Sequence, residues 1–117
     1  MAVQQIIDIT DDLNTGSSAT LDIGGWDFVV VHLVTPTGPV NFLTSNDGGG
    51  VSGVSDGNAV SATNFVAVTG TVLATGASAT LLSASGLIKF SGIGQFLRIS
   101  GTAIAVTKAF IRYYKSF

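Results

Sequence analysis

The sequence has no cysteine, no glutamate and a single histidine, and only 10% of its 117 residues are charged. Without cysteine there can be neither a disulfide bond nor a thiolate metal ligand, so the hydrophobic core has to stabilise the fold alone. Paired carboxylates of the glycosidase type would have to come from aspartates in turns, and a lone histidine cannot form a zinc-binding pair. We therefore expect a protein that is not an enzyme and holds no cofactor, with His32 in the core or at an interface.

Long apolar runs and basic stretches are missing too. No apolar run approaches the roughly 18 residues of a membrane-spanning helix, and the first residues lack the basic start of a signal peptide. The net charge of −2 does not favour nucleic-acid binding, which needs a concentrated basic surface. These absences predict a soluble, unprocessed protein with neither a membrane nor a nucleic acid as its partner.

The few charges are segregated along the chain. All seven aspartates precede residue 57, and all five basic residues follow it. Such a division can create an acidic patch and a basic patch on one domain, which would suit head-to-tail contacts between copies. Antiparallel pairing of the two halves would instead mix the charges, and the sequence leaves both interpretations open.

The remaining composition favours β-structure. Hydrophobic residues make up 46% of the chain, and β-branched residues alternate with serine, threonine and glycine. Turn signals recur at intervals of roughly eight to twelve residues, which is typical of an all-β sandwich or barrel. We predict one domain over residues 1–117, a single antiparallel β-sandwich of jelly-roll or immunoglobulin-like type with eight or nine strands. The predicted strands are 3–10, 19–23, 26–35, 40–45, 64–73, 79–83, 86–90, 95–100 and 103–114.

Local patterns refine this prediction. Both faces of strand 26–35 are mostly apolar, which indicates a central strand. Residues 36–39 indicate a tight reversal, so strands 26–35 and 40–45 should form a hairpin. The polar residues 11–16 indicate a turn, and Trp26 is expected to anchor the core.

The last predicted strand carries bulky residues on both of its faces. A β-bulge near Lys108 would restore a one-sided pattern. Otherwise a protein partner covers the second face, because aromatic residues and arginine are enriched in interface cores. The expected contact residues are Ile6, Ile7, Phe110, Arg112, Tyr113, Tyr114 and Phe117.

The longest predicted loop covers residues 46–62 and is rich in glycine, serine, aspartate and asparagine, which predicts an exposed tip. Its candidate contact residues are Asn46, Asp47, Gly48, Asp56 and Asn58. Two oxygen-rich groups could in principle hold calcium, one in residues 8–14 and one in this loop. Neither spacing matches an EF-hand, and turn formation explains both groups.

Several short segments follow one another in a characteristic order. They are GWDFVVV at 25–31, GPVNF at 38–42, SNDG at 45–48, FVAV at 65–68, a strand from 86 to 90, and FLRI at 96–99. With this order and spacing the chain, from about residue 17 to 114, resembles small β-sandwich modules that are common in the virion proteins of tailed bacteriophages.

The resemblance implies a virion component made in the host cytoplasm. We expect a capsid decoration or cement protein that forms a homo-oligomer, such as a trimer, and that binds the major capsid protein or tail proteins. The alternative is a tail, neck or fibre module that binds a host receptor or glycan through the 46–62 loop and nearby aromatic residues.

Overall fold

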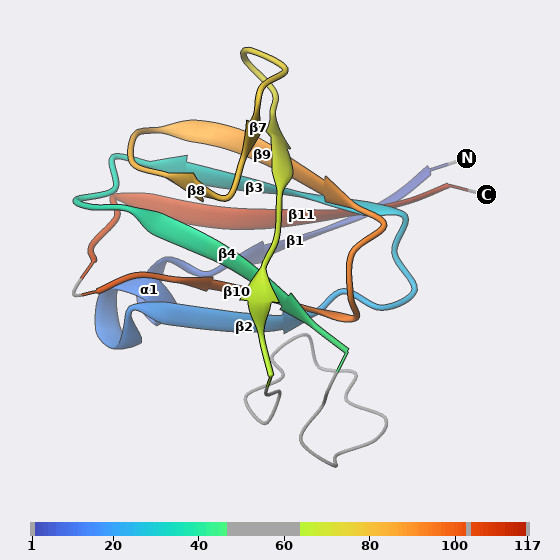
Figure 1. Ribbon diagram of the computed structural model, residues 1–117, viewed down its shortest axis with the longest axis horizontal. Coiled ribbons are helices and arrows are strands. Elements are labelled where there is room, and N and C mark those ends of the chain that lie inside the picture. Colours follow the sequence, from blue (N-terminus) through green and yellow to red (C-terminus); the bar gives the residue numbers. More distant parts are fainter. Residues whose placement is uncertain (1, 47–63, 103, 117) are drawn as a thin grey trace.

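A computed structural model describes residues 2–46, 64–102 and 104–116. In these residues the chain forms two antiparallel sheets that pack face to face (Figure 1). The predicted all-β antiparallel sandwich is therefore confirmed. No helix in the described part of the chain is long and apolar enough to cross a membrane.

The first sheet has six strands in the order β1–β11–β3–β9–β6–β7. Their bounds are Ala2–Asp8 (β1), Lys108–Ser116 (β11), Phe28–Val34 (β3), Gly86–Ser91 (β9), Gly70–Val72 (β6) and Ser78–Ala79 (β7). The second sheet has the order β2–β10–β4–β5, and β8 also pairs with β4. Their bounds are Ser18–Asp22 (β2), Phe96–Ser100 (β10), Val40–Ser45 (β4), Val66–Ala67 (β5) and Leu81–Leu82 (β8).

The core lies between the inner faces of the two sheets. Val29, Val31 and Leu33 of β3 are buried, while the residues between them are half-exposed, as expected for a strand with one face on the core. Across the sandwich, the rings of Phe42 on β4 and Phe90 on β9 lie 5.0 Å apart. Strand β3 lies between β11 and β9, so its predicted central position is confirmed.

The predicted hairpin between strands 26–35 and 40–45 is wrong, because β3 and β4 belong to different sheets. Val40 and Phe42 are buried, so both strands turn an apolar face to the core and pack face to face. The connection arches from one sheet to the other. It is held by Thr37, whose backbone N–H donates to the Ala105 carbonyl and whose hydroxyl accepts from the Ala105 N–H, both at 2.9 Å.

The prediction of a turn at residues 11–16 is also wrong, because Thr10–Gly16 forms a short helix, α1. Leu13 is buried and stands one helical turn after the buried Ile9, so one side of α1 packs against the core. Two polar side chains tie α1 to the end of the chain. Asn14 exchanges hydrogen bonds with the Val106 backbone at 2.7 and 3.0 Å, and the Thr10 hydroxyl accepts from the Ala109 N–H at 2.9 Å.

Two predicted strands are each divided between the sheets, which raises the number of described strands to eleven. Strand 64–73 becomes β5 in the second sheet and β6 in the first, and strand 79–83 becomes β7 and β8 in the same way. The crossing needs a glycine, because a Cβ on Gly70 would lie 2.6 Å from Phe90 Cε1 and 2.8 Å from the Lys89 carbonyl oxygen. This crossing segment links the two sheets at one side of the sandwich.

The last strand begins at Lys108, later than predicted. Ile104 and Val106 precede it and are buried, so they do not share the outward side of Phe110 and Tyr114. The alternation shifts at Thr107, whose N–H donates to the Val34 carbonyl although Lys108 is the register partner of Val34. Thr107 and Lys108 therefore both oppose Val34, as in a β-bulge. The shift moves Ile104 and Val106 inward but leaves the aromatic residues of β11 on both faces.

Candidate functional site

The solvent-facing side of the six-stranded sheet, here called the outer face, gathers apolar, aromatic and basic side chains. The register places Ile6, Arg112 and Val30 in one row across β1, β11 and β3, and the row continues to Lys89 on β9. Because side chains alternate along each strand, the residues two positions away point to the same side. The outer face includes Ile6, Asp8, Phe28, Val30, His32, Leu87, Lys89, Lys108, Phe110, Arg112 and Tyr114.

Aromatic rings on the outer face are paired across strands. Phe28 and Tyr114 are register partners, and their rings stack with centroids 4.5 Å apart and planes 14° apart. The Lys89 ammonium lies 4.3 Å from the centroid of the Phe28 ring. His32 and Phe110 are also partners, with ring centroids 6.2 Å apart. Cross-strand and cation–π contacts of this kind restrict the rotamers of these side chains.

A shallow groove of about 520 Å³ follows this face. It is lined by Ile6, Val30, His32, Leu73, Leu87, Phe110, Arg112 and Tyr114. Ile6 is 54% exposed and Leu87 is 40% exposed, so large aliphatic side chains face water there. Contiguous exposed apolar surface on a small domain is typical of an interaction site.

The charges of the described residues are only partly separated in space. Arg112 and Lys89 lie on the outer face, whereas Asp11 and Asp12 are exposed in the first turn of α1. Acidic and basic side chains lie close together where β1 meets β11, since Asp8 lies near Lys108. Hydrogen bonds from Thr10 lower the pKa of the Asp8 carboxyl, and Lys108 lowers it further.

No family model matches this sequence, and no curated protein matches it. The fold, however, has been seen before. The chain is similar to the crystal structure of the SPBc2 prophage-derived protein YomS, with a TM-score of 0.64 at 9% identity over 97% of this chain and 93% of that one. A chain from Bacillus endospore appendages, which form disulfide-linked pili, gives a TM-score of 0.44 at 22% identity over 99% of this chain and 88% of that one. The likeness to YomS shows a shared fold.

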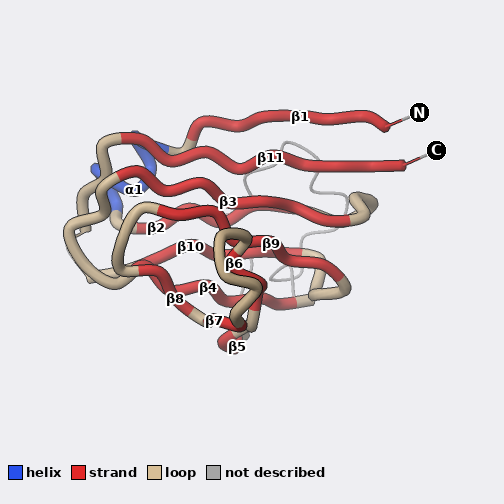
Figure 2. Tube along the Cα trace, turned by 90° about the horizontal axis from the view of Figure 1, so that it is seen from above, coloured by secondary structure: helices blue, strands red, loops and turns tan. Residues whose placement is uncertain are grey.

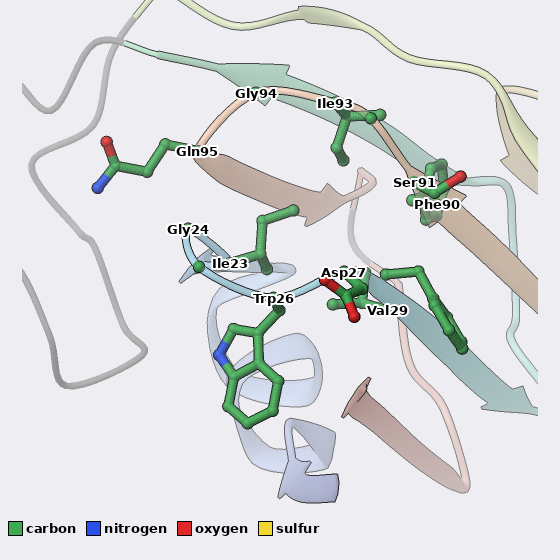
Figure 3. Close-up of a pocket in the computed structure, with 13 residues that line it drawn as sticks. Ile23, Gly24, Trp26, Asp27, Val29, Phe90, Ser91, Ile93, Gly94 and Gln95 are labelled. Carbon is green, nitrogen blue, oxygen red and sulfur yellow. The ribbon is translucent and has the colours of Figure 1, made fainter. Parts of the chain in front are cut away.

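A second hollow of about 340 Å³ lies at one end of the sandwich, between residues 23–29 and 90–95 (Figure 3). Its polar side chains hold the loops together. Gln95 donates to the Asp22 carboxylate at 3.4 Å, and the backbone N–H of Gln95 donates to Asn46 Oδ1 at 2.8 Å. In Figure 3 the Trp26 indole points away from Ile93 and Gln95.

The predicted contact residues divide between the two faces of the sheet. Ile6, Phe110, Arg112 and Tyr114 lie together on the outer face. Tyr113 points the other way, is 2% exposed and packs its ring 5.2 Å from that of the half-buried Trp26. Ile7 is half-buried and also packs against the core, and Phe117 lies outside the described residues. We therefore leave Ile7 and Tyr113 out of the candidate site.

The structure adds Phe28, His32, Leu87 and Lys89 to the site. The alternation of strand 26–35 already placed Phe28 and His32 on one face, but only the register shows that this face adjoins Phe110 and Tyr114. Leu87 and Lys89 carry no distinguishing signal in the sequence, because their place depends on β9 pairing with β3.

Of the predicted exposed loop, Asp47, Gly48, Asp56 and Asn58 lie outside the described residues. Asn46 is exposed, and its side chain accepts the Gln95 hydrogen bond. In residues 8–14, Asp8 Oδ1 accepts from the Thr10 N–H at 2.9 Å, and Asn14 bonds to Val106. The described residues contain no group of three or more histidine, cysteine or acidic side chains placed to hold a metal ion.

Proposed function

We propose that this protein is a structural component of a bacteriophage particle, a capsid decoration or cement protein that works through its outer face and not as an enzyme. The likeness in fold to a prophage-derived protein supports the phage assignment. The resemblance of the ordered sequence segments to virion modules points the same way. The mechanism is the burial of apolar and aromatic surface between neighbouring subunits.

The observation that carries this proposal is the exposed groove over β1, β11, β3 and β9. Its walls combine exposed aliphatic side chains, such as Ile6 and Leu87, with half-buried rings and an arginine. Buried aromatic and arginine side chains provide most of the binding energy in protein interfaces. The cross-strand ring pairs have already fixed Phe28 and Tyr114, so less side-chain entropy is lost on binding.

The proposed occupant is a second copy of this chain. Arg112, Lys89 and Lys108 outnumber Asp8 on the outer face, so the face is basic, which opposes face-to-face contact between identical faces. A neighbour that presents the exposed Asp11 and Asp12 of α1 would instead complement these charges. Such a contact joins two different surfaces, and heterologous contacts of this type form a ring such as a trimer when the rotation between subunits closes.

Light scattering on the purified protein tests the proposal, with a closed oligomer as the expected result. Arg112→Glu should raise the dissociation constant at least about ten-fold, or roughly 1.4 kcal/mol, because it sets a carboxylate against the acidic turn of α1. Adding Asp12→Lys to Arg112→Glu should restore much of the association. Asp27→Ala is the matched control, since it removes an exposed charge outside the groove.

A monomer at all concentrations would refute self-association. Stoichiometric binding of that monomer to empty capsids, lost in Arg112→Glu, would support the cement role. The capsid protein, and not a second copy, would then occupy the groove. Saturable binding to a host glycan without capsid binding would refute the cement role and support a tail or fibre module.

A further inference from the structure

Strand β1 forms one edge of the six-stranded sheet, and the described residues leave this edge open to further strand pairing. Among the described residues no strand lies on its far side (Figure 2). Proteins usually protect an edge strand by making it short, by a bulge, or by charged side chains and proline. Residues 2–7 contain neither charge nor proline, and all seven residues of β1 pair with β11 without interruption.

The other sheet edges in the described part of the chain are less suitable for pairing. Strands β7 and β5 have two residues each, too few to template another strand. Strand β2 is shorter than β1, with five residues against seven. Among the edges in the described part of the chain, β1 therefore offers the longest uncharged run, residues 2–7.

The hydrogen-bonding groups at this edge follow from the ladder with β11. The Ile9 N–H donates to the Ala109 carbonyl at 2.9 Å, and hydrogen-bonded positions alternate along an antiparallel pair. Ile7 and Gln5 therefore direct their N–H and C=O groups toward β11. The N–H and C=O groups of Gln4 and Ile6 point away from β11, out of the sheet. Another β-strand is the natural complement of such a row of donors and acceptors.

We propose that β1 pairs antiparallel with β1 of a second copy, so that one sheet continues through both subunits. Full overlap of the two Ala2–Asp8 strands sets Gln5 opposite Gln5 of the partner subunit, on the twofold axis. Antiparallel pairing also sends the two Asp8 carboxylates to opposite ends of the new ladder, whereas a parallel pair in register would place them side by side. The contact uses the backbone edge and does not depend on the outer face.

A cysteine at position 5 tests this arrangement, because the chain has no cysteine of its own. Gln5 is exposed, and its backbone groups face β11, so Gln5 and its counterpart form a non-hydrogen-bonded pair. Cα atoms in such a pair are about 4.5 Å apart, within the roughly 4.4 to 6.8 Å spanned by a disulfide. Oxidised Gln5→Cys should run as a reducible dimer on a gel.

The matched control is Ala84→Cys, a thiol at another exposed position in the turn before β9. At about 10 μM protein Gln5→Cys should cross-link roughly 100-fold faster than Ala84→Cys, because pairing holds its thiols at an effective concentration on the order of 1 mM. Equal rates for the two variants would overturn the proposal.

Gln4→Pro provides a second test. It removes one N–H from the outward edge and none from the ladder with β11, so the fold should persist by circular dichroism while cross-linking of Gln5→Cys falls to the Ala84→Cys rate. Cross-linking that survives Gln4→Pro in a folded protein would refute strand pairing. Arg112→Glu should leave the Gln5→Cys cross-link unchanged, so this contact and the outer-face contact can fail separately.

Discussion

Replacing Tyr113 by phenylalanine should stabilise the protein. The Tyr113 side chain is 2% exposed, and its hydroxyl has no hydrogen-bond partner among the described residues. A buried polar group without a partner costs about 1–3 kcal/mol, while its ring still packs against Trp26. Tyr113→Phe removes the oxygen and keeps the ring, so the free energy of unfolding should rise by about 1–2 kcal/mol. For a domain of this size that corresponds to roughly 4 °C in Tm for each kcal/mol.

Urea and thermal unfolding of the wild type, Tyr113→Phe and Tyr114→Phe measure this effect. Tyr114 is the neighbouring residue on the outer face and is half-exposed, so loss of its hydroxyl should change stability by less than about 0.5 kcal/mol. If Tyr113→Phe loses 1 kcal/mol or more, the hydroxyl forms a hydrogen bond in the folded protein and the reasoning is wrong.

The same residue predicts an alkaline limit to stability. Burial raises the pKa of the Tyr113 phenol above its ordinary value near 10, and Asp22 raises it further. The folded state therefore keeps the proton, while the unfolded chain releases it as the pH rises through about 10. The free energy of unfolding should be unaffected below that pH and should fall above it. Tyr113→Phe should show a shallower fall between about pH 10 and 11.5, and identical slopes would refute this assignment.

Three further substitutions test the fold by equilibrium unfolding. Gly70→Ala should destabilise by about 1–3 kcal/mol, because its Cβ would overlap Phe90, and an unchanged midpoint would mean that the crossing segment yields freely. Asn14→Ala should cost about 1–2 kcal/mol by removing both hydrogen bonds to Val106; no loss would mean that water replaces them. Thr35 has φ 51°, a conformation that β-branched residues disfavour, so Thr35→Asn should gain up to about 1 kcal/mol, and a loss would contradict this account.

The sequence was sufficient for the fold class because alternation and turn residues are local signals. Strand β4 was predicted with its observed bounds, and β3 was recognised as central from its two apolar faces. The pairing of strands was not predictable in the same way. Residues 36–39 look like a hairpin turn, but whether the chain turns back beside β3 or crosses to the other sheet depends on what else the inner faces contact.

The short helix and the candidate site were missed for related reasons. Residues 10–16 have the composition of a turn. Helix α1 forms because Leu13 packs into the core and Asn14 hydrogen-bonds to Val106, which is 92 residues away in the sequence. The β11 side of the site could be read from the alternation of Phe110, Arg112 and Tyr114. The β9 side could not, because Leu87 and Lys89 acquire their role only through the register with β3.

The first and last described residues, Ala2 and Ser116, are register partners, so both ends of the described chain leave the molecule at the same corner (Figure 2). This placement determines how the domain would respond to mechanical force. Tension applied between the two ends would act across the β1–β11 ladder at its open end and break its hydrogen bonds one pair at a time. Tension along the strands would instead load all pairs of the ladder together. The domain should therefore resist tension along its strands better than tension applied between Ala2 and Ser116.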